Sequence, residues 1–94
     1  MIKNLEELVS DGLHLVYFSA SWCGPCKKMS KTIDEINNID VIKIDTEKNS
    51  KLVFKYKIMS VPTMIIFKNG KKLLEISGIK TKKELDEIIS KYED

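Results

Sequence analysis

The sequence predicts an α/β fold with a mixed four-stranded sheet that is covered by helices on both faces. Short apolar runs separate stretches whose apolar residues recur at helical spacing, and a two-residue turn signal joins the last two runs. Strands separated by helices run parallel, whereas a tight turn joins antiparallel strands, so one sheet contains both directions. A chain of 94 residues suffices for one domain, which we expect to span residues 1–94.

The N-terminal segment predicts a short helix followed by a central strand. Asn4 and Glu7 form a capping pair in front of an apolar stripe, and Gly12 ends this first helix. The run at 14–19 is apolar without alternation, which is typical of a strand covered on both faces.

A second helix is predicted from Pro25 to about Asn37. Pro25 fits a first helical turn because its missing N–H would have no helical partner there. Apolar residues recur at spacings of three and four from Cys26 onward, so this residue faces inward. A second buried strand is expected at 41–44.

The C-terminal half predicts a helix, a hairpin and a final helix. Asn69-Gly70 is a strong signal for a two-residue hairpin, and Thr81 with Glu84 forms a capping box. The expected elements are a helix at 47–56, strands at 63–67 and 73–77, and a helix after Thr81.

Composition excludes several classes of function. The 16 basic residues nearly cancel the 14 acidic ones, and a net charge of +2 is too small for a nucleic-acid-binding surface. The longest apolar run, 15–20, is too short to cross a membrane, and no signal peptide is visible. We therefore expect a cytoplasmic protein that binds neither nucleic acid nor membrane.

The only two cysteines, Cys23 and Cys26, are separated by Gly24-Pro25 and follow Trp22. Two intervening residues at the start of a helix allow the sulfurs to reach one another. Free N–H groups of the first turn and the helix dipole favour a thiolate at Cys23, and the thiolate is the nucleophile. In a reducing compartment such a pair is typical of redox catalysis or of half a metal site. A zinc cage would require a second chain because the lone His14 is distant, so we expect no metal.

Four sequence blocks, in this order, resemble the thioredoxin family. They are Trp22-Cys23-Gly24-Pro25-Cys26-Lys27, Val61-Pro62-Thr63, Phe67-Lys68-Asn69-Gly70 and Gly78. Their spacings also fit, so the resemblance covers nearly the whole chain. It implies the thioredoxin fold, a cis peptide bond before Pro62, and the reduction of protein disulfides.

The resemblance also implies roles for individual residues. Cys23 attacks a client disulfide, and Cys26 then attacks Cys23 and releases the reduced client. Trp22, Gly24, Pro25, Tyr17, Lys43 and Pro62 support the pair. An apolar rim holds the client, and it consists of Trp22, Pro25, Met59, Ser60, Val61, Pro62, Gly78 and Ile79. We expect a monomer that binds no cofactor and is recharged by a thioredoxin reductase, a flavoprotein using NADPH.

The sequence departs from the family at three places. Tyr17 stands where the family has a buried Asp that moves the proton of the second thiol, and a neutral phenol is a poor proton acceptor. Lys43 matches a lysine that lies near that Asp in the family. Its amine either accepts the Cys26 proton or stabilises the Cys26 thiolate, or it merely extends to water while Tyr17 fills space. Lys31 replaces a kinking proline, so we expect a straighter helix. Only Met1–Lys3 precede the first helix, leaving at most a stub of a fifth strand. The strand at 41–44 would then lie nearer an edge of the sheet than is usual in the family.

Two other functions stay open at this point. A glutaredoxin-like reductase that uses glutathione would suit the short N-terminal segment, although Gly24-Pro25 between the cysteines suits a thioredoxin better. A binding module that uses the surface of Trp22 and Pro62, with redox chemistry incidental, is the alternative from another class.

Overall fold

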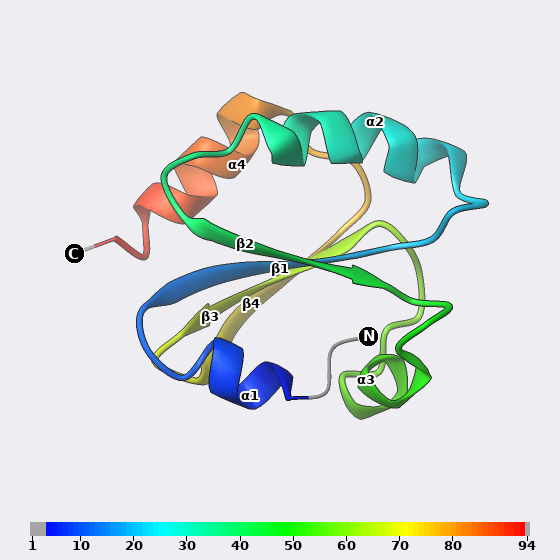
Figure 1. The fold of residues 1–94 in the computed structure, drawn as a ribbon. Coiled ribbons are helices and arrows are strands. Elements are labelled where there is room, and N and C mark those ends of the chain that lie inside the picture. Colours follow the sequence, from blue (N-terminus) through cyan, green and yellow to red (C-terminus); the bar gives the residue numbers. More distant parts are fainter. Residues whose placement is uncertain (1–3, 94) are drawn as a thin grey trace.

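A computed structural model of the protein describes residues 4–93, which form four helices and four strands in the predicted order (Figure 1). The elements are α1 (Leu5–Leu8), β1 (Leu13–Ser19), α2 (Gly24–Asp34), β2 (Asp40–Asp45), α3 (Ser50–Lys55), β3 (Thr63–Lys68), β4 (Lys71–Ser77) and α4 (Lys82–Ser90). The strands form one sheet in the order β2-β1-β3-β4. β1 is parallel to β2 and antiparallel to β3, which is antiparallel to β4, so the predicted mixed sheet is confirmed. The expected stub of a fifth strand lies outside the described residues.

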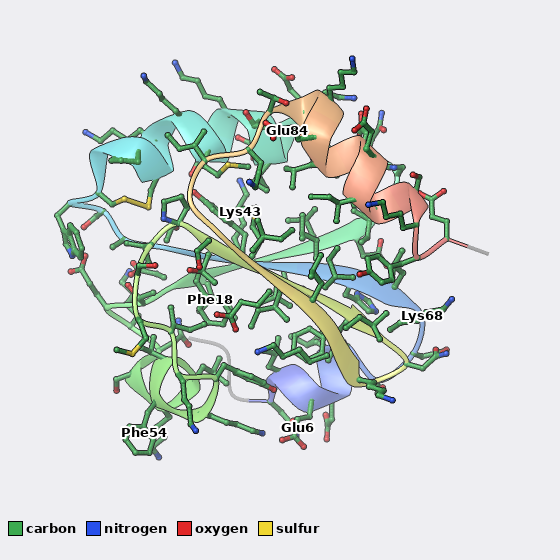
Figure 2. The ribbon with its side chains drawn as sticks, turned by 180° about the vertical axis from the view of Figure 1, so that it is seen from behind. Glu6, Phe18, Lys43, Phe54, Lys68 and Glu84 are labelled. Atoms are coloured by element: carbon green, nitrogen blue, oxygen red, sulfur yellow. A yellow bond between two sulfur atoms is a disulfide. The ribbon has the colours of Figure 1, made fainter. Side chains whose placement is uncertain are left out.

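Helices cover both faces of the sheet. Figure 1 shows α2 and α4 on one face, and α1 and α3 on the other. Alternate residues of β1 enter the two cores: Leu15 and Tyr17 pack toward α2 and α4, while Val16 and Phe18 (labelled in Figure 2) pack on the opposite side. Residues 14–18 of β1 are all buried, as predicted for a central strand.

The strand predicted at 41–44 is present, and its position agrees with the hypothesis that it lies near an edge, but the prediction that it is buried is wrong. β2 pairs with β1 and has no second neighbour among residues 4–93, so it forms an edge of the described sheet. Of its residues only Ile44 is buried. Apolar side chains at Val41 and Ile42 are half-buried because each covers one face of an edge strand rather than the sheet centre.

Three helices are shorter than predicted, and local hydrogen bonds explain two of them. α1 ends at Leu8 rather than at Gly12, since the Val9 carbonyl accepts the N–H of Gly70 at 2.8 Å instead of continuing the helix. α3 begins at Ser50 because the Asp45 carboxylate accepts the N–H of Glu47 at 2.9 Å, which holds the preceding residues in a turn. α2 ends at Asp34, three residues before the predicted end.

The Asn69-Gly70 hairpin is confirmed, and its tip anchors the N-terminal part of the chain. Both residues have positive φ, 51° and 83°, as a type I′ turn requires. The N–H of Asn69 donates to the Gly12 carbonyl at 2.9 Å, and the Asn69 side-chain oxygen accepts the N–H of Gly12 at 2.9 Å. This pair of bonds ties the loop after α1 to the far end of the sheet.

The predicted capping box of α4 is also confirmed. Thr81 accepts the N–H of Glu84 at 3.1 Å, and the Glu84 carboxylate accepts the N–H of Thr81 at 3.1 Å. Leu85 and Ile89 of this helix are buried against the sheet. Within residues 4–93, no helix combines the length and apolarity that crossing a membrane requires.

Candidate functional site

The two cysteines lie at the N-terminal end of α2, with their sulfurs at disulfide-bonding distance. Cys23 is the N-cap residue, and its Cα is 5.2 Å from that of Cys26. The backbone N–H of Cys26 points at Cys23 Sγ, 3.2 Å away. Pro25 occupies the first turn, where it removes no helical hydrogen bond. The helix therefore directs both an N–H group and its positive end at the Cys23 sulfur.

The cysteines are shielded from solvent by the loop that precedes β3. Cys23 and Cys26 are 4% and 2% exposed, and they pack with Ala20 and Val61. Cys23 Sγ lies 3.8 Å from the Val61 carbonyl oxygen. The Val61–Pro62 peptide bond is cis, as the resemblance implied, and Pro62 is buried. Val61 therefore borders the Cys23 sulfur.

Most of the predicted rim residues gather around this point. Trp22, Met59, Ser60 and Val61 line one hollow of about 170 Å³. Gly78 reaches the site from the end of β4, since its N–H donates to the Pro62 carbonyl at 2.9 Å. The following residue, Ile79, is 50% exposed, and the next N–H, of Lys80, contacts the sulfur of Met29 in α2 at 3.4 Å. Beside the cysteines, a Cβ added at Gly24 would meet no atom within 4 Å, so the space over the first turn is open.

Tyr17 lies beneath the helix turn that carries Cys26. Its side chain is fully buried, and its hydroxyl donates a hydrogen bond to the Cys26 carbonyl oxygen at 2.9 Å. The Ser30 hydroxyl lies 3.1 Å from the same phenol oxygen. Sequence reasoning missed Ser30, although its position four residues after Cys26 places both on one helix face.

Lys43 is the register partner of Tyr17 in β2, so it lies on the same face of the sheet. About half of its side chain is exposed, and its amine forms an ion pair with Asp34 of α2. Of the two roles considered for Lys43, the structure therefore favours the surface one.

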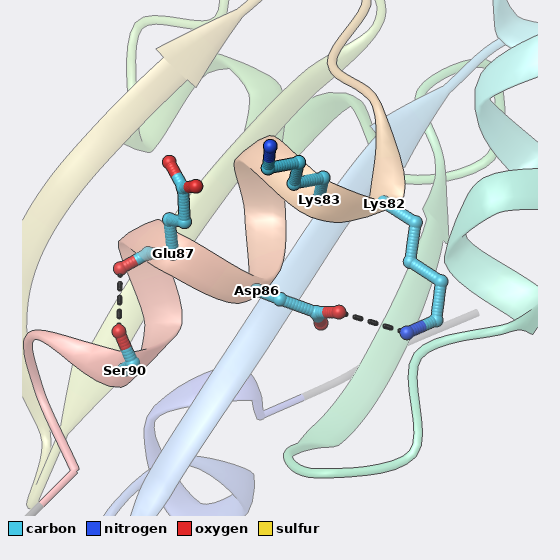
Figure 3. A pocket seen from close by; sticks show the side chains of 5 residues that line it. All are labelled: Lys82, Lys83, Asp86, Glu87 and Ser90. Carbon is cyan, nitrogen blue, oxygen red and sulfur yellow. Dashed lines mark hydrogen bonds and ion pairs between the residues drawn. The ribbon is translucent and has the colours of Figure 1, made fainter.

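A second hollow, of about 430 Å³, lies on the outer side of α4 (Figure 3). Lys82, Lys83, Asp86, Glu87 and Ser90 line it. The Lys82 ammonium donates a hydrogen bond to the Asp86 carboxylate at 2.8 Å, and this bond raises the pKa of Lys82. This hollow includes none of the predicted site residues. Among residues 4–93, no three His, Cys, Asp or Glu side chains are grouped as a metal site would require.

Comparisons with known proteins agree on one family. The thioredoxin family model matches residues 2–91. Thioredoxin from Staphylococcus haemolyticus (strain JCSC1435) is 34% identical over 95 residues, covering 96% of this chain and 91% of that protein. Thioredoxin from Staphylococcus aureus (strain MW2) is 34% identical over 94 residues, covering 95% of this chain and 90% of that protein.

The similar solved structures are also thioredoxins. A mutant thioredoxin from Halobacterium salinarum NRC-1 superposes with a TM-score of 0.88 at 30% identity, covering 96% of this chain and 83% of the other. Oxidised thioredoxin from Plasmodium falciparum superposes with a TM-score of 0.82 at 28% identity, covering 98% of this chain and 92% of the other. Together with a cysteine pair at disulfide distance, these matches establish that the chain belongs to the thioredoxin family of protein-disulfide oxidoreductases.

Proposed function

We propose that the chain reduces disulfides of client proteins, with Cys23 as the nucleophile and Cys26 as the resolving thiol. The observation that carries the proposal is the Cys26 N–H directed at Cys23 Sγ from the first turn of α2. A negative charge on Cys23 is stabilised there by this donor and by the helix dipole. Among residues 4–93, no N–H group of the helix end donates to the sulfur of Cys26, which lies within α2.

The exchange proceeds in two steps that balance. The Cys23 thiolate attacks one client sulfur, the client S–S bond breaks, and the leaving client thiolate takes up a proton. Cys26 then gives up its proton and attacks Cys23 Sγ, which releases the second client thiol and forms the Cys23–Cys26 disulfide. Two electrons pass to the client, and a dithiol partner must later return two to the chain.

Residues around the pair support this chemistry. Trp22, Pro25, Met59, Ser60, Val61, Pro62, Gly78 and Ile79 form the rim that receives the client. The Val61 backbone pairs with an extended client segment as an added strand does. Gly24 leaves the approach to Cys23 open, while Tyr17 holds the Cys26 turn from below. Lys43, which pairs with Asp34 at the surface, has no part in proton transfer.

We further propose that the protein is a cytoplasmic monomer with one thioredoxin-like domain over residues 1–94. Both cysteines belong to one chain, so the exchange requires no second copy. The electron donor is a thioredoxin reductase, a flavoprotein that uses NADPH. Reactivation of the oxidised protein by NADPH and such a reductase, but not by glutathione alone, would support this donor over a glutaredoxin-like route.

Trapping the mixed disulfide tests the order of attack. Cys26→Ser should accumulate a covalent adduct between Cys23 and oxidised insulin, detected by mass spectrometry, since the resolving thiol is absent. Cys23→Ser should form no such adduct and should not reduce insulin. An adduct formed mainly through Cys26 in the Cys23→Ser variant would reverse the assignment. Alkylation of reduced Cys23 by iodoacetamide should also be faster at neutral pH than that of an ordinary thiol.

A further inference from the structure

Three large apolar side chains near the candidate site are largely exposed. Trp22, Phe54 and Met59 are 73%, 87% and 91% exposed. Figure 2 shows Phe54 projecting outward from α3 into solvent. Single exposed apolar residues are ordinary on a protein surface, whereas several that lie near one another favour a binding site.

Two hollows connect these side chains with the cysteine pair. The hollow of about 170 Å³ beside Trp22 and Val61 adjoins a groove of about 500 Å³ along α3. The groove is lined by Ser50, Val53, Phe54, Lys57, Ile58 and Met59, and we call it the α3 groove. Val53, Ile58 and Met59 line both hollows, so these three apolar side chains link the surroundings of Val61 to Phe54.

Lys57 adds a charge to the wall of the α3 groove. It has φ of 53°, in the left-handed region where glycine is the usual residue after a helix. The N–H of Ile58 donates to the Val53 carbonyl at 2.9 Å, and that of Lys57 donates to the Phe54 carbonyl at 3.2 Å, so this is a Schellman motif. A lysine in this conformation costs stability, which makes its side chain a candidate for a functional role.

We propose that the α3 groove binds the segment of a client protein next to its disulfide, and selects a large apolar side chain flanked by a carboxylate. The inference rests on the proposed function, since only a client engaged at Cys23 brings its chain across Met59. The apolar side chain packs between Phe54 and Met59, and the carboxylate pairs with Lys57. The groove thus gives the reductase a preference among disulfides that are equally accessible.

Matched peptides test the preference. Each peptide contains one disulfide and one of three dipeptides, Phe-Glu, Ser-Glu or Phe-Gln. In a series of peptides the dipeptide is moved stepwise away from the disulfide, on its N-terminal and on its C-terminal side. Chain reduced beforehand with dithiothreitol and freed of it is mixed with excess peptide in a single turnover. The second-order rate constant and its saturation with peptide concentration are measured for each. Hydroxyethyl disulfide is the reference, because it is too small to occupy the α3 groove and reach Cys23 at once.

The expected effects are confined to particular pairs of variant and peptide. Phe54→Ser should lower the rate constant for the best Phe-Glu peptide about tenfold, through a higher half-saturating concentration. It should leave the Ser-Glu peptide and hydroxyethyl disulfide unchanged. Lys57→Gly should lower the Phe-Glu rate constant about two- to fivefold and leave the Phe-Gln peptide unchanged. Leu8→Ser, which removes another exposed apolar side chain, on α1, should change none of them.

Each contrary result has a distinct meaning. Equal rates for Phe54→Ser and the unmodified chain on every peptide would overturn the groove while leaving the proposed function intact. Failure of the reduced chain to act on any peptide or on hydroxyethyl disulfide would overturn the proposed function, and the groove's role with it. A dimer at assay concentration that Phe54→Ser converts to a monomer, detected by sedimentation, would show that a second copy occupies the groove instead.

Discussion

The Tyr17 hydroxyl donates a hydrogen bond to the carbonyl oxygen of Cys26, with 2.9 Å between the two oxygens. The bond joins the central strand of the sheet to the helix turn that carries the proposed resolving thiol. Since the phenol binds a backbone atom and the Ser30 hydroxyl, its position suits holding the turn in place. The predicted space-filling role of Tyr17 therefore extends to a specific polar contact.

Tyr17→Phe should lower stability without slowing disulfide reduction. The change keeps the buried ring but removes the bonds to Cys26 and Ser30, and one buried hydrogen bond is worth about 0.5–1.5 kcal/mol. The free energy of unfolding, measured in urea, should fall by about that amount. A proton-transfer role would instead cost ~10²–10⁴ in the rate of insulin reduction at neutral pH. Ser30→Ala is the control: it removes only one of the two hydrogen-bond partners of Tyr17, so the free energy of unfolding should fall less than in Tyr17→Phe.

Tyr17→Asp should speed the reduction of insulin at neutral pH, although the protein becomes less stable. The resemblance to the family implies that a carboxylate at this position takes the proton of the resolving thiol. Its shorter side chain leaves a cavity in the core formed with Met29 and Met64, so the loss of stability is expected. The rate is compared in the unmodified and variant proteins after circular dichroism shows that both are folded. An unchanged or slower rate in folded protein would mean that proton removal from Cys26 is not limiting.

Asn69→Ala should destabilise the protein by about 1–2 kcal/mol, because it loses an acceptor and places a less suitable residue at positive φ. Asn69→Gly separates the two causes, since glycine tolerates φ of 51° but cannot accept the N–H of Gly12. Asn69→Gly should therefore lose less stability than Asn69→Ala. Equal stability of all three proteins in urea would show that the hairpin tip does not anchor the loop after α1.

Lys57→Gly should raise the free energy of unfolding by about 0.5–1 kcal/mol. A side chain in the left-handed region costs ~1–2 kcal/mol, and the greater freedom of glycine in the unfolded chain offsets part of that gain. Lys51→Gly, within α3, should lower the free energy by about 0.5–1 kcal/mol, because glycine disfavours a helix. A loss of stability in both variants would contradict the strain assigned to Lys57. If Lys57→Gly is more stable and also reduces the Phe-Glu peptide more slowly, the strain at Lys57 is linked to function.

The fold could be predicted from the sequence because its signals are local. The capping pairs of α1 and α4, the Asn69-Gly70 turn and the apolar periodicity of α2 each depend on neighbours in the chain, and the structure confirms them. Helix ends could not be predicted as well, since a long-range bond decides one of them. The N–H of Gly70, in the turn between β3 and β4, donates to the Val9 carbonyl. The pattern of residues around Val9 does not reveal this bond. The partial exposure of β2 likewise depends on strand order, whereas its own apolar residues predicted a buried strand.

The cysteine pair and the cis bond before Pro62 could be expected from motifs, but their surroundings could not. Ser30 is an ordinary helix residue in the sequence, and its contact with Tyr17 arises only when α2 packs on β1. Phe54 lies two residues from both Leu52 and Tyr56, off the face that their helical spacing predicts to be buried, and it is 87% exposed. The sequence does not reveal that this side chain borders the same hollow as Met59, because that arrangement depends on how α3 packs beside the loop before β3.

Glu84→Gln should destabilise the protein at neutral pH but not in acid. The pKa of the Glu84 carboxyl is lowered, first because it accepts the N–H of Thr81, then because it interacts with the Thr81 side chain, with a smaller contribution from the charge of Lys80. A carboxyl whose pKa is lower in the folded state stabilises the fold above its unfolded pKa, and this contribution is lost as pH falls through the folded value.

Urea unfolding of both proteins at about pH 7 and about pH 2 measures this difference. Glutamine keeps an oxygen that can accept the N–H of Thr81, so the comparison isolates the charge. The two stabilities should differ at the higher pH and converge toward the lower one, as Glu84 becomes protonated in the folded state too. In a Thr81→Ala background, which removes the hydroxyl half of the capping box, the effect of Glu84→Gln should be smaller. A difference that persists or grows in acid would assign the role of Glu84 to packing rather than to its charge at the start of α4.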